Sequence, residues 1–289
     1  MKAKWSIAGS MFLFGSIGLF VRNIACSSAQ TALFRGVAGC IFLLAVFFFR
    51  KEKIQPGAIK KNLPLLICSG AAVGANWIFL FEAYRYTSVA TATLSYYFAP
   101  VIVLFLSPVL LKERLTPKKT GCIAAAVLGM FLIAGADIAG TGNLKGILLG
   151  LTAAVFYASI ILMNKMIKGL SGLTLTMIQL AAASAVLLPY VAATDGLQIH
   201  TDQVSIILLF IVGVFHTGIG YFFYFSGVQK VPGQTAAILS YIDPAFAILL
   251  SGLFLHETLT FLQLAGGVLV LFAAFLGGME KSSTAEPLS

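Results

Sequence analysis

The sequence predicts an all-α integral membrane protein whose ten transmembrane helices form two inverted five-helix repeats. Composition is the first observation: 59% of the residues are hydrophobic and 10% are charged, whereas soluble domains carry about 25% charged residues. The second is that the apolar residues form long continuous runs, as membrane helices require. The third is an internal repeat, in which residues 84–117 align without a gap with residues 228–261.

Ten apolar segments approach the roughly 20 residues that a helix needs to cross the hydrocarbon core. Turn signals such as Pro56-Gly57 and Val231-Pro232-Gly233 separate them. The expected spans are residues 5–21, 31–49, 63–83, 88–110, 118–136, 144–164, 174–193, 204–226, 235–255 and 261–278.

The N-terminus resembles a signal peptide, because Lys2 and Lys4 precede an apolar stretch. Arg22 and Asn23 occupy positions where a cleavage site needs apolar residues, and a second long apolar run follows at once. We therefore expect this segment to remain in the mature protein as the first membrane helix.

The positive charges predict the orientation. With the N-terminus inside, fifteen of the nineteen Lys and Arg residues fall in inner loops. Arg22, Arg85 and Lys145 fall in outer loops, and Arg35 lies within the second helix. The positive-inside rule then places both termini in the cytoplasm. The net charge of +9 follows from this topology, so it does not indicate a nucleic-acid partner.

The repeat predicts the division into halves. Ten of its 34 aligned positions are identical, and they include a shared Pro-x12-Glu-x-Leu-Thr pattern that stands out in apolar sequence. Five helices is an odd number, so the second half enters the membrane inverted, as in many secondary transporters. We expect the halves to be residues 1–142 and 143–279, followed by a disordered cytoplasmic tail at 280–289.

The two motif copies make the chain resemble the EamA group of the drug/metabolite transporter superfamily. They read Ala99-Pro100 with Glu113-Arg114-Leu115-Thr116, and Asp243-Pro244 with Glu257-Thr258-Leu259-Thr260. The stretches Asn76-Trp77-Ile78-Phe79 and Ala32-Leu33-Phe34-Arg35 are also similar to this group. The resemblance implies a ten-helix carrier with a central cavity lined by both halves. Many members export amino acids or related metabolites, often in exchange for protons, and others import or carry other small molecules.

Asp243 is the candidate for proton coupling. It lies eight residues beyond Thr235, which is about 12 Å deep at ~1.5 Å per residue. A charged Asp at a helix centre costs about 2.5–3.5 kcal/mol, so it usually faces a cavity, a partner or a proton. The alternative is that Asp243 caps backbone freed by Pro244. The matched position in the first half is Ala99.

The candidate substrate-binding residues are polar and aromatic side chains within the spans. His216 could bind substrate or relay a proton, and its alternative is an interhelical hydrogen bond. Trp77 lies deeper than an interfacial anchor. The tyrosines could bind cations or rings, or simply fill space between helices. The expected set is Asn76, Trp77, Tyr97, Tyr157, His216, Tyr224 and Tyr241.

Other residues are expected to serve motion and packing. Pro100 and Pro244 are expected hinges in matched helices, and Glu113 and Glu257 are expected to hold loops at helix ends. Glu82 and Arg85 can pair on one helix face. Arg35 could snorkel, or it could attract a substrate carboxylate. Glycines four residues apart predict close helix packing at Gly70 and Gly74 and at Gly146 and Gly150.

Together these features predict a multi-pass protein of the bacterial cytoplasmic membrane, namely a secondary active transporter that works by alternating access. Proton-coupled export of amino acids or related metabolites is the leading function. An importer or a drug or organic-cation efflux carrier is the alternative of the same fold, and a membrane scaffold or receptor is the non-transporter alternative. We expect no enzyme, because ligand-type side chains are not grouped at one face. We expect no metal or cofactor, because the four cysteines form no C-x-x-C pair. We expect no direct use of ATP, because the chain has no P-loop.

Overall fold

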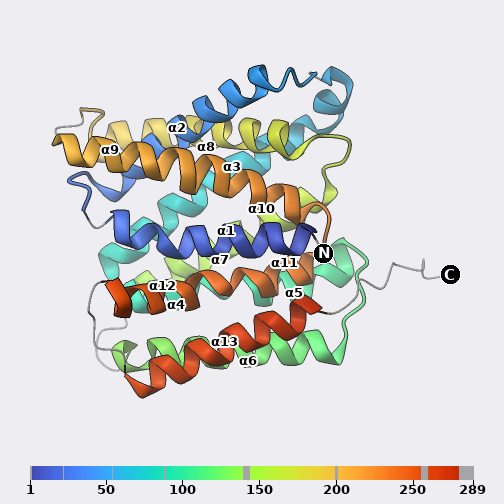
Figure 1. The fold of residues 1–289 in the computed structure, drawn as a ribbon, viewed down its shortest axis with the longest axis vertical. Helices are drawn as coiled ribbons and strands as arrows, with labels where there is room; N and C mark the ends of the chain where they lie inside the picture. The colour runs from blue at the N-terminus through green and yellow to red at the C-terminus, as the bar shows by residue number, and fades with distance from the viewer. Residues whose placement is uncertain are drawn as a thin grey trace.

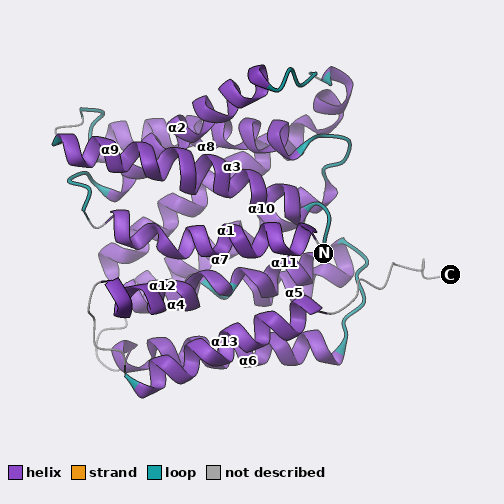
Figure 2. Cartoon of the chain, viewed as in Figure 1, coloured by secondary structure: helices purple, strands orange, loops and turns teal. Residues whose placement is uncertain are grey.

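The computed structural model describes residues 2–21, 23–53, 55–87, 89–138, 144–198, 201–254 and 260–279. Every regular element in those ranges is a helix (Figure 2). The predicted all-α class is therefore confirmed. The expected tail at 280–289 lies outside the described residues.

The described elements are thirteen α-helices and one π-helical segment, η1. In chain order they are α1 (Lys2–Val21), α2 (Ser28–Phe49), α3 (Pro56–Tyr86), α4 (Val89–Tyr96), α5 (Ala99–Leu110), α6 (Pro117–Ile138), α7 (Leu144–Met166), α8 (Gly172–Thr194), α9 (Gln203–Ile211), η1 (Val212–Ile219), α10 (Gly220–Val228), α11 (Gly233–Ser240), α12 (Ile242–Phe254) and α13 (Phe261–Met279).

Six helices among the described residues are long and apolar enough to cross a membrane, judged by length and composition. Five of them are single elements, namely α1, α2, α3, α7 and α8. The sixth is the continuous helix Gln203–Val228, which comprises α9, η1 and α10. These helices establish a multi-pass membrane protein.

Two of the expected spans are broken. The predicted helix 88–110 is α4 followed by α5, and the predicted helix 235–255 is α11 followed by α12. Pro100 cannot donate a backbone hydrogen bond to Tyr96, where α4 ends, and Pro244 cannot donate one to Ser240, where α11 ends. The prolines therefore divide the matched helices at the same point.

Helix boundaries repeat along the whole chain. Adding 144 to the bounds of α2 gives 172–193, and α8 spans Gly172–Thr194. Adding 144 to the bounds of α4 gives 233–240, which are the bounds of α11. The packing repeats as well, because α7 packs against α3, α4 and α5 as α1 packs against α10, α11 and α12.

Most of the helices lie side by side and run across the view, and α2 is inclined to them (Figure 1). α6 and α13 pack together at one end of the stack, and α2, α8 and α9 lie at the other. Helices α1, α4, α5, α7, α11 and α12 lie between them (Figure 1). The N-terminus of α1 and the end of α13 lie on the same edge, at the right of the view.

Glycines bring helices into close contact where the sequence predicts it. A Cβ at Gly70 would lie 2.6 Å from the Ala182 Cβ and 2.8 Å from the Gln179 carbonyl oxygen on α8. A Cβ at Gly150 would lie 2.9 Å from the Ala92 carbonyl oxygen on α4. Real Cβ atoms do not approach backbone this closely, so these helix pairs require glycine.

We predict that Gly70→Ala lowers the stability of the detergent-solubilised protein by about 1–3 kcal/mol, the usual cost of overpacking. The added methyl group meets backbone atoms of α8, which cannot move aside as a side chain can. Thermal unfolding checks the prediction. The matched control is Gly121→Ala in α6, where a Cβ meets nothing within 4 Å. Equal stability of the two variants would contradict the proposed contact.

Candidate functional site

Two contacts join residues that occupy matched positions in the two repeats. The Trp77 indole N–H donates to the Tyr221 hydroxyl over 3.3 Å, and these residues are 144 apart. The Tyr241 hydroxyl donates to the Tyr97 carbonyl oxygen over 3.1 Å, again across 144 residues. Their ring centroids lie 5.9 Å and 6.4 Å apart. A residue can contact its own counterpart only near the axis that relates the halves, so these pairs mark that axis.

Asp243 lies beside the second pair. The Tyr97 hydroxyl donates to Asp243 Oδ2 over 2.9 Å, so a side chain from one repeat binds the acid of the other. Helix α1 approaches Asp243 closely, because a Cβ at Gly15 would lie 2.6 Å from the Asp243 carbonyl oxygen.

A network of hydroxyl groups lies beyond Tyr97, and ring contacts join it to Tyr97. The Tyr157 and Tyr224 hydroxyls lie 2.9 Å apart, and Tyr157 donates to Ser240 Oγ over 3.0 Å. The Tyr96 ring stacks on Tyr157 with centroids 5.4 Å apart and contacts Tyr97 at 5.3 Å. Through the Tyr96 ring, these hydroxyl groups, which include Ser240 at the end of α11, are joined to Tyr97 and so to Asp243 at the start of α12.

Arg35 forms the other charged end of the site. Its guanidinium carbon lies 4.1 Å from the centre of the Trp77 ring, a cation–π contact. Its Nε is buried and has no hydrogen-bond partner among the described residues. The rings between Arg35 and Asp243, which we call the aromatic cluster, are Trp77, Tyr96, Tyr97, Tyr157, Tyr221 and Tyr224. Phe14 of α1 contacts both Tyr221 and Tyr224.

Two further residues of the expected substrate-binding set make contacts between helices. Asn76 is 3% exposed, and its Nδ2 donates to the Ala153 carbonyl oxygen of α7 over 2.7 Å. His216 lies in η1, with its Nε2 3.1 Å from Ser16 Oγ and its ring against Phe20 of α1. Neither residue is hydrogen-bonded to the aromatic cluster.

The expected loop-end residues have different outcomes. Glu113 Oε1 accepts from the Gly233 N–H over 2.7 Å and Oε2 accepts from the Gln234 N–H over 3.3 Å, at the first turn of α11. Glu257 lies outside the described residues. The expected pair of Glu82 and Arg85 is confirmed by a 2.9 Å salt bridge.

Three members of the site were not in the expected set, namely Tyr96, Tyr221 and Ser240, whereas Arg35 was expected either to snorkel or to attract a substrate carboxylate. The repeat carried a signal for Tyr221, because it lies 144 residues after Trp77. No comparable signal identified Ser240. Among the described residues, no group of three His, Cys, Asp or Glu side chains could hold a metal ion.

Comparison with known proteins gives consistent matches over most of the chain. The model of the EamA-like transporter family matches residues 1–135 and 144–278. An uncharacterized transporter of Bacillus subtilis (strain 168) is 31% identical over 279 residues, which cover 91% of this chain and 85% of that protein. Solute carrier family 35 member G1 of Homo sapiens is 26% identical, over 93% of this chain and 76% of that protein.

Two further matches concern function and fold separately. A Salmonella typhimurium protein named "Probable amino-acid metabolite efflux pump" is 27% identical, over 83% of this chain and 84% of that protein. A protein crystal structure matches with a TM-score of 0.83 at 17% identity, over 96% of this chain and 98% of that chain. The structural match establishes similarity of fold alone.

We predict that Glu113→Ala destabilises the protein by about 0.5–2 kcal/mol, because it leaves two N–H groups at the start of α11 without their acceptor. Thermal unfolding in detergent is the measurement, with Arg114→Ala, an exposed neighbour, as the control. Glu113→Gln, which keeps one acceptor oxygen, should fall between. An Arg114→Ala variant as unstable as Glu113→Ala would show that the loop, and not the cap, is sensitive.

Proposed function

This chain belongs to the EamA-like transporter family, and from that premise we propose that it is a secondary active transporter that exports amino acids or related small metabolites in exchange for protons. The hydrogen bond between Tyr97 and Asp243 carries the proposal. In this contact, an acid of the second repeat accepts a hydrogen bond from a hydroxyl of the first repeat, near the axis that relates the two repeats.

The proposed topology has ten crossings of the cytoplasmic membrane, with both termini inside. Six membrane-length helices contribute six of them. We assign the other four to α4 with α5, to α6, to α11 with α12, and to α13. The halves are residues 1–142 and 143–279, and the repeated helix boundaries support this division. The shared edge of α1's start and α13's end in Figure 1 supports an even number of crossings.

Exchange follows from the chemistry of a single acid. Asp243 can hold a proton or face the cationic group of a substrate, and it cannot do both at once. Because the proton and the substrate compete for this one acid, the inward movement of protons is coupled to the outward movement of substrate. Ionised Asp243 also accepts a stronger hydrogen bond from Tyr97 than its neutral form does. Protonation therefore loosens a link between the halves, which must separate during alternating access.

The charges of the site favour a zwitterionic substrate. Asp243 stands at one side of the aromatic cluster and Arg35 at the other. An amino acid presents a carboxylate for Arg35, an ammonium group for Asp243, and a side chain that can pack on the rings. The printed name of the Salmonella typhimurium relative supports this class of substrate. Pro100 and Pro244 are the proposed hinges, because the helices on either side of them lack continuous backbone hydrogen bonding.

We predict that Asp243→Asn reduces proton-driven accumulation to the level of empty liposomes while leaving exchange of labelled for unlabelled substrate in place. The measurement is uptake of an amino-acid panel into proteoliposomes with an acidic interior. Asp195→Asn, an acid at the end of α8, is the control and should behave as the wild type. Gradient-driven uptake that survives in Asp243→Asn would refute the coupling role. Accumulation of organic cations alone would assign the site to cation efflux.

We predict that Arg35→Gln weakens apparent affinity for an amino acid by ~10- to 100-fold, the usual effect of removing a charged hydrogen-bond donor. Its effect on the matching decarboxylated amine should be small, because that amine has no group for Arg35 to bind. The measurement compares the two ligands by competition in wild-type and variant proteoliposomes. An equal loss for both ligands would show that Arg35 acts on packing around Trp77 and not on a carboxylate.

A further inference from the structure

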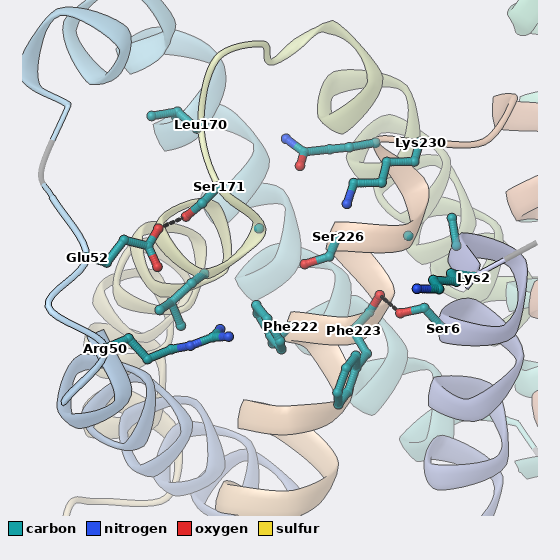
Figure 3. A pocket seen from close by; sticks show the side chains of 15 residues that line it. Lys2, Ser6, Arg50, Glu52, Leu170, Ser171, Phe222, Phe223, Ser226 and Lys230 are labelled. Carbon is teal, nitrogen blue, oxygen red and sulfur yellow. Dashed lines mark hydrogen bonds between the residues drawn. The ribbon is translucent and has the colours of Figure 1, made fainter. Parts of the chain in front are cut away.

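A pocket lies away from the aromatic cluster, where the ends of four helices meet. It has a volume of about 520 Å³ and is drawn in Figure 3. Helix α1 begins beside it at Lys2, α2 ends at Phe49, α8 begins at Gly172 and α10 ends at Val228. We call it the helix-end pocket. Because three of these helices are of membrane-spanning length and the fourth ends the span Gln203–Val228, it lies where they leave the bilayer.

Three cations surround the helix-end pocket. Figure 3 shows the charged ends of Lys2, Arg50 and Lys230 turned toward its middle from different sides. Among the described residues, no acid forms a salt bridge with any of them. The acid in the lining is Glu52, which instead accepts hydrogen bonds from Ser171 and Thr174 at the start of α8. The three cations therefore remain available to an anion.

The walls of the helix-end pocket are held by specific contacts. Ser6 Oγ donates to the Phe223 carbonyl oxygen over 2.8 Å, which fastens α1 to α10. Gly172 allows α8 to begin against Ser226, since a Cβ there would overlap the Ser226 hydroxyl. The pocket is thus a built concavity and not a gap between loose loops.

Apolar side chains adjoin the cations. Phe49, the last residue of α2 and the neighbour of Arg50, is 88% exposed, and Phe48 is 69% exposed. Phe223, in the lining itself, is 45% exposed. Exposed rings next to cations at the end of membrane helices form a surface for a molecule with an anionic head and apolar tails.

We propose that the helix-end pocket binds the phosphate of an anionic phospholipid headgroup. Lys2, Arg50 and Lys230 contact the phosphate, and the acyl chains lie along the exposed phenylalanines. The walls come from α1 and α2 of one repeat and from α8 and α10 of the other, so a bound lipid joins the two repeats at this edge. A soluble phosphate shares the headgroup chemistry but does not use the phenylalanines.

The test measures lipid retention and thermal unfolding of the full-length protein in detergent. The probes are dioleoyl phosphatidylglycerol, dioleoyl phosphatidylcholine, inorganic phosphate and glycerol 3-phosphate. We expect phosphatidylglycerol to remain bound in native mass spectrometry and to raise the unfolding temperature, with little effect from phosphatidylcholine. The double variant R50Q/K230Q should weaken phosphatidylglycerol binding on the order of tenfold or more, because each Lys or Arg strengthens the attraction to an anionic lipid headgroup.

The matched control is K61Q/K118Q, which removes the same charge at two exposed positions outside the pocket, one in α3 and one in α6. Equal lipid retention by R50Q/K230Q and the wild type would overturn the site. An equal loss in the control would reduce the effect to net charge and would also overturn it. If free phosphate or glycerol 3-phosphate stabilised the protein as strongly as phosphatidylglycerol does, the ligand of the pocket would be a soluble phosphate and not a lipid, and the proposal would be overturned. We expect proton-driven transport to be unchanged in R50Q/K230Q and in K61Q/K118Q. Failure of the lipid proposal can therefore be distinguished from failure of the proton-coupling proposal, which the Asp243→Asn variant tests.

Discussion

A proline in a membrane helix leaves a carbonyl without its backbone donor, and lipid cannot supply another. Pro100 and Pro244 create this situation at matched points, after α4 and after α11. Such breaks are tolerated only where protein or a polar cavity surrounds them. The broken helices must therefore lie inside the bundle, where α1 and α7 pack against them. The polar side chains gather at these breaks for the same reason, which fixes the position of the candidate site.

The scaffold is symmetric but its chemistry is not. Trp77 pairs with Tyr221 and Tyr97 pairs with Tyr241, each across 144 residues. Asp243, however, corresponds to Ala99. A repeated scaffold can adopt two related arrangements of its halves. A single acid gives one position at which protonation could favour one arrangement over the other. One proton site per two halves is the simplest arrangement by which the proposed exchange could work.

Features that depend on composition and on the repeat could be read from the sequence. The apolar runs gave the helical class, the glycine spacing gave the close contact at Gly70, and Pro100 and Pro244 indicated where helices weaken. The direction in which each helix face points could not be predicted from the sequence. Asn76 and His216 are polar within apolar helices, as the site residues are, but they lie against α7 and α1. The helix-end pocket joins residues as distant as Lys2 and Lys230, and no local pattern links them.

The contact between Tyr97 and Tyr241 is like a contact across the two-fold axis of a dimer. In an isologous dimer, a residue on the two-fold axis touches its own copy in the other subunit. Tyr97 and Tyr241 hold equivalent positions and touch in this way, within one chain. The interior of this chain is thus arranged like the interior of a homodimer. Because each half has its own stretch of sequence, one half can carry Asp243 where the other carries Ala99, a difference that two identical subunits could not have.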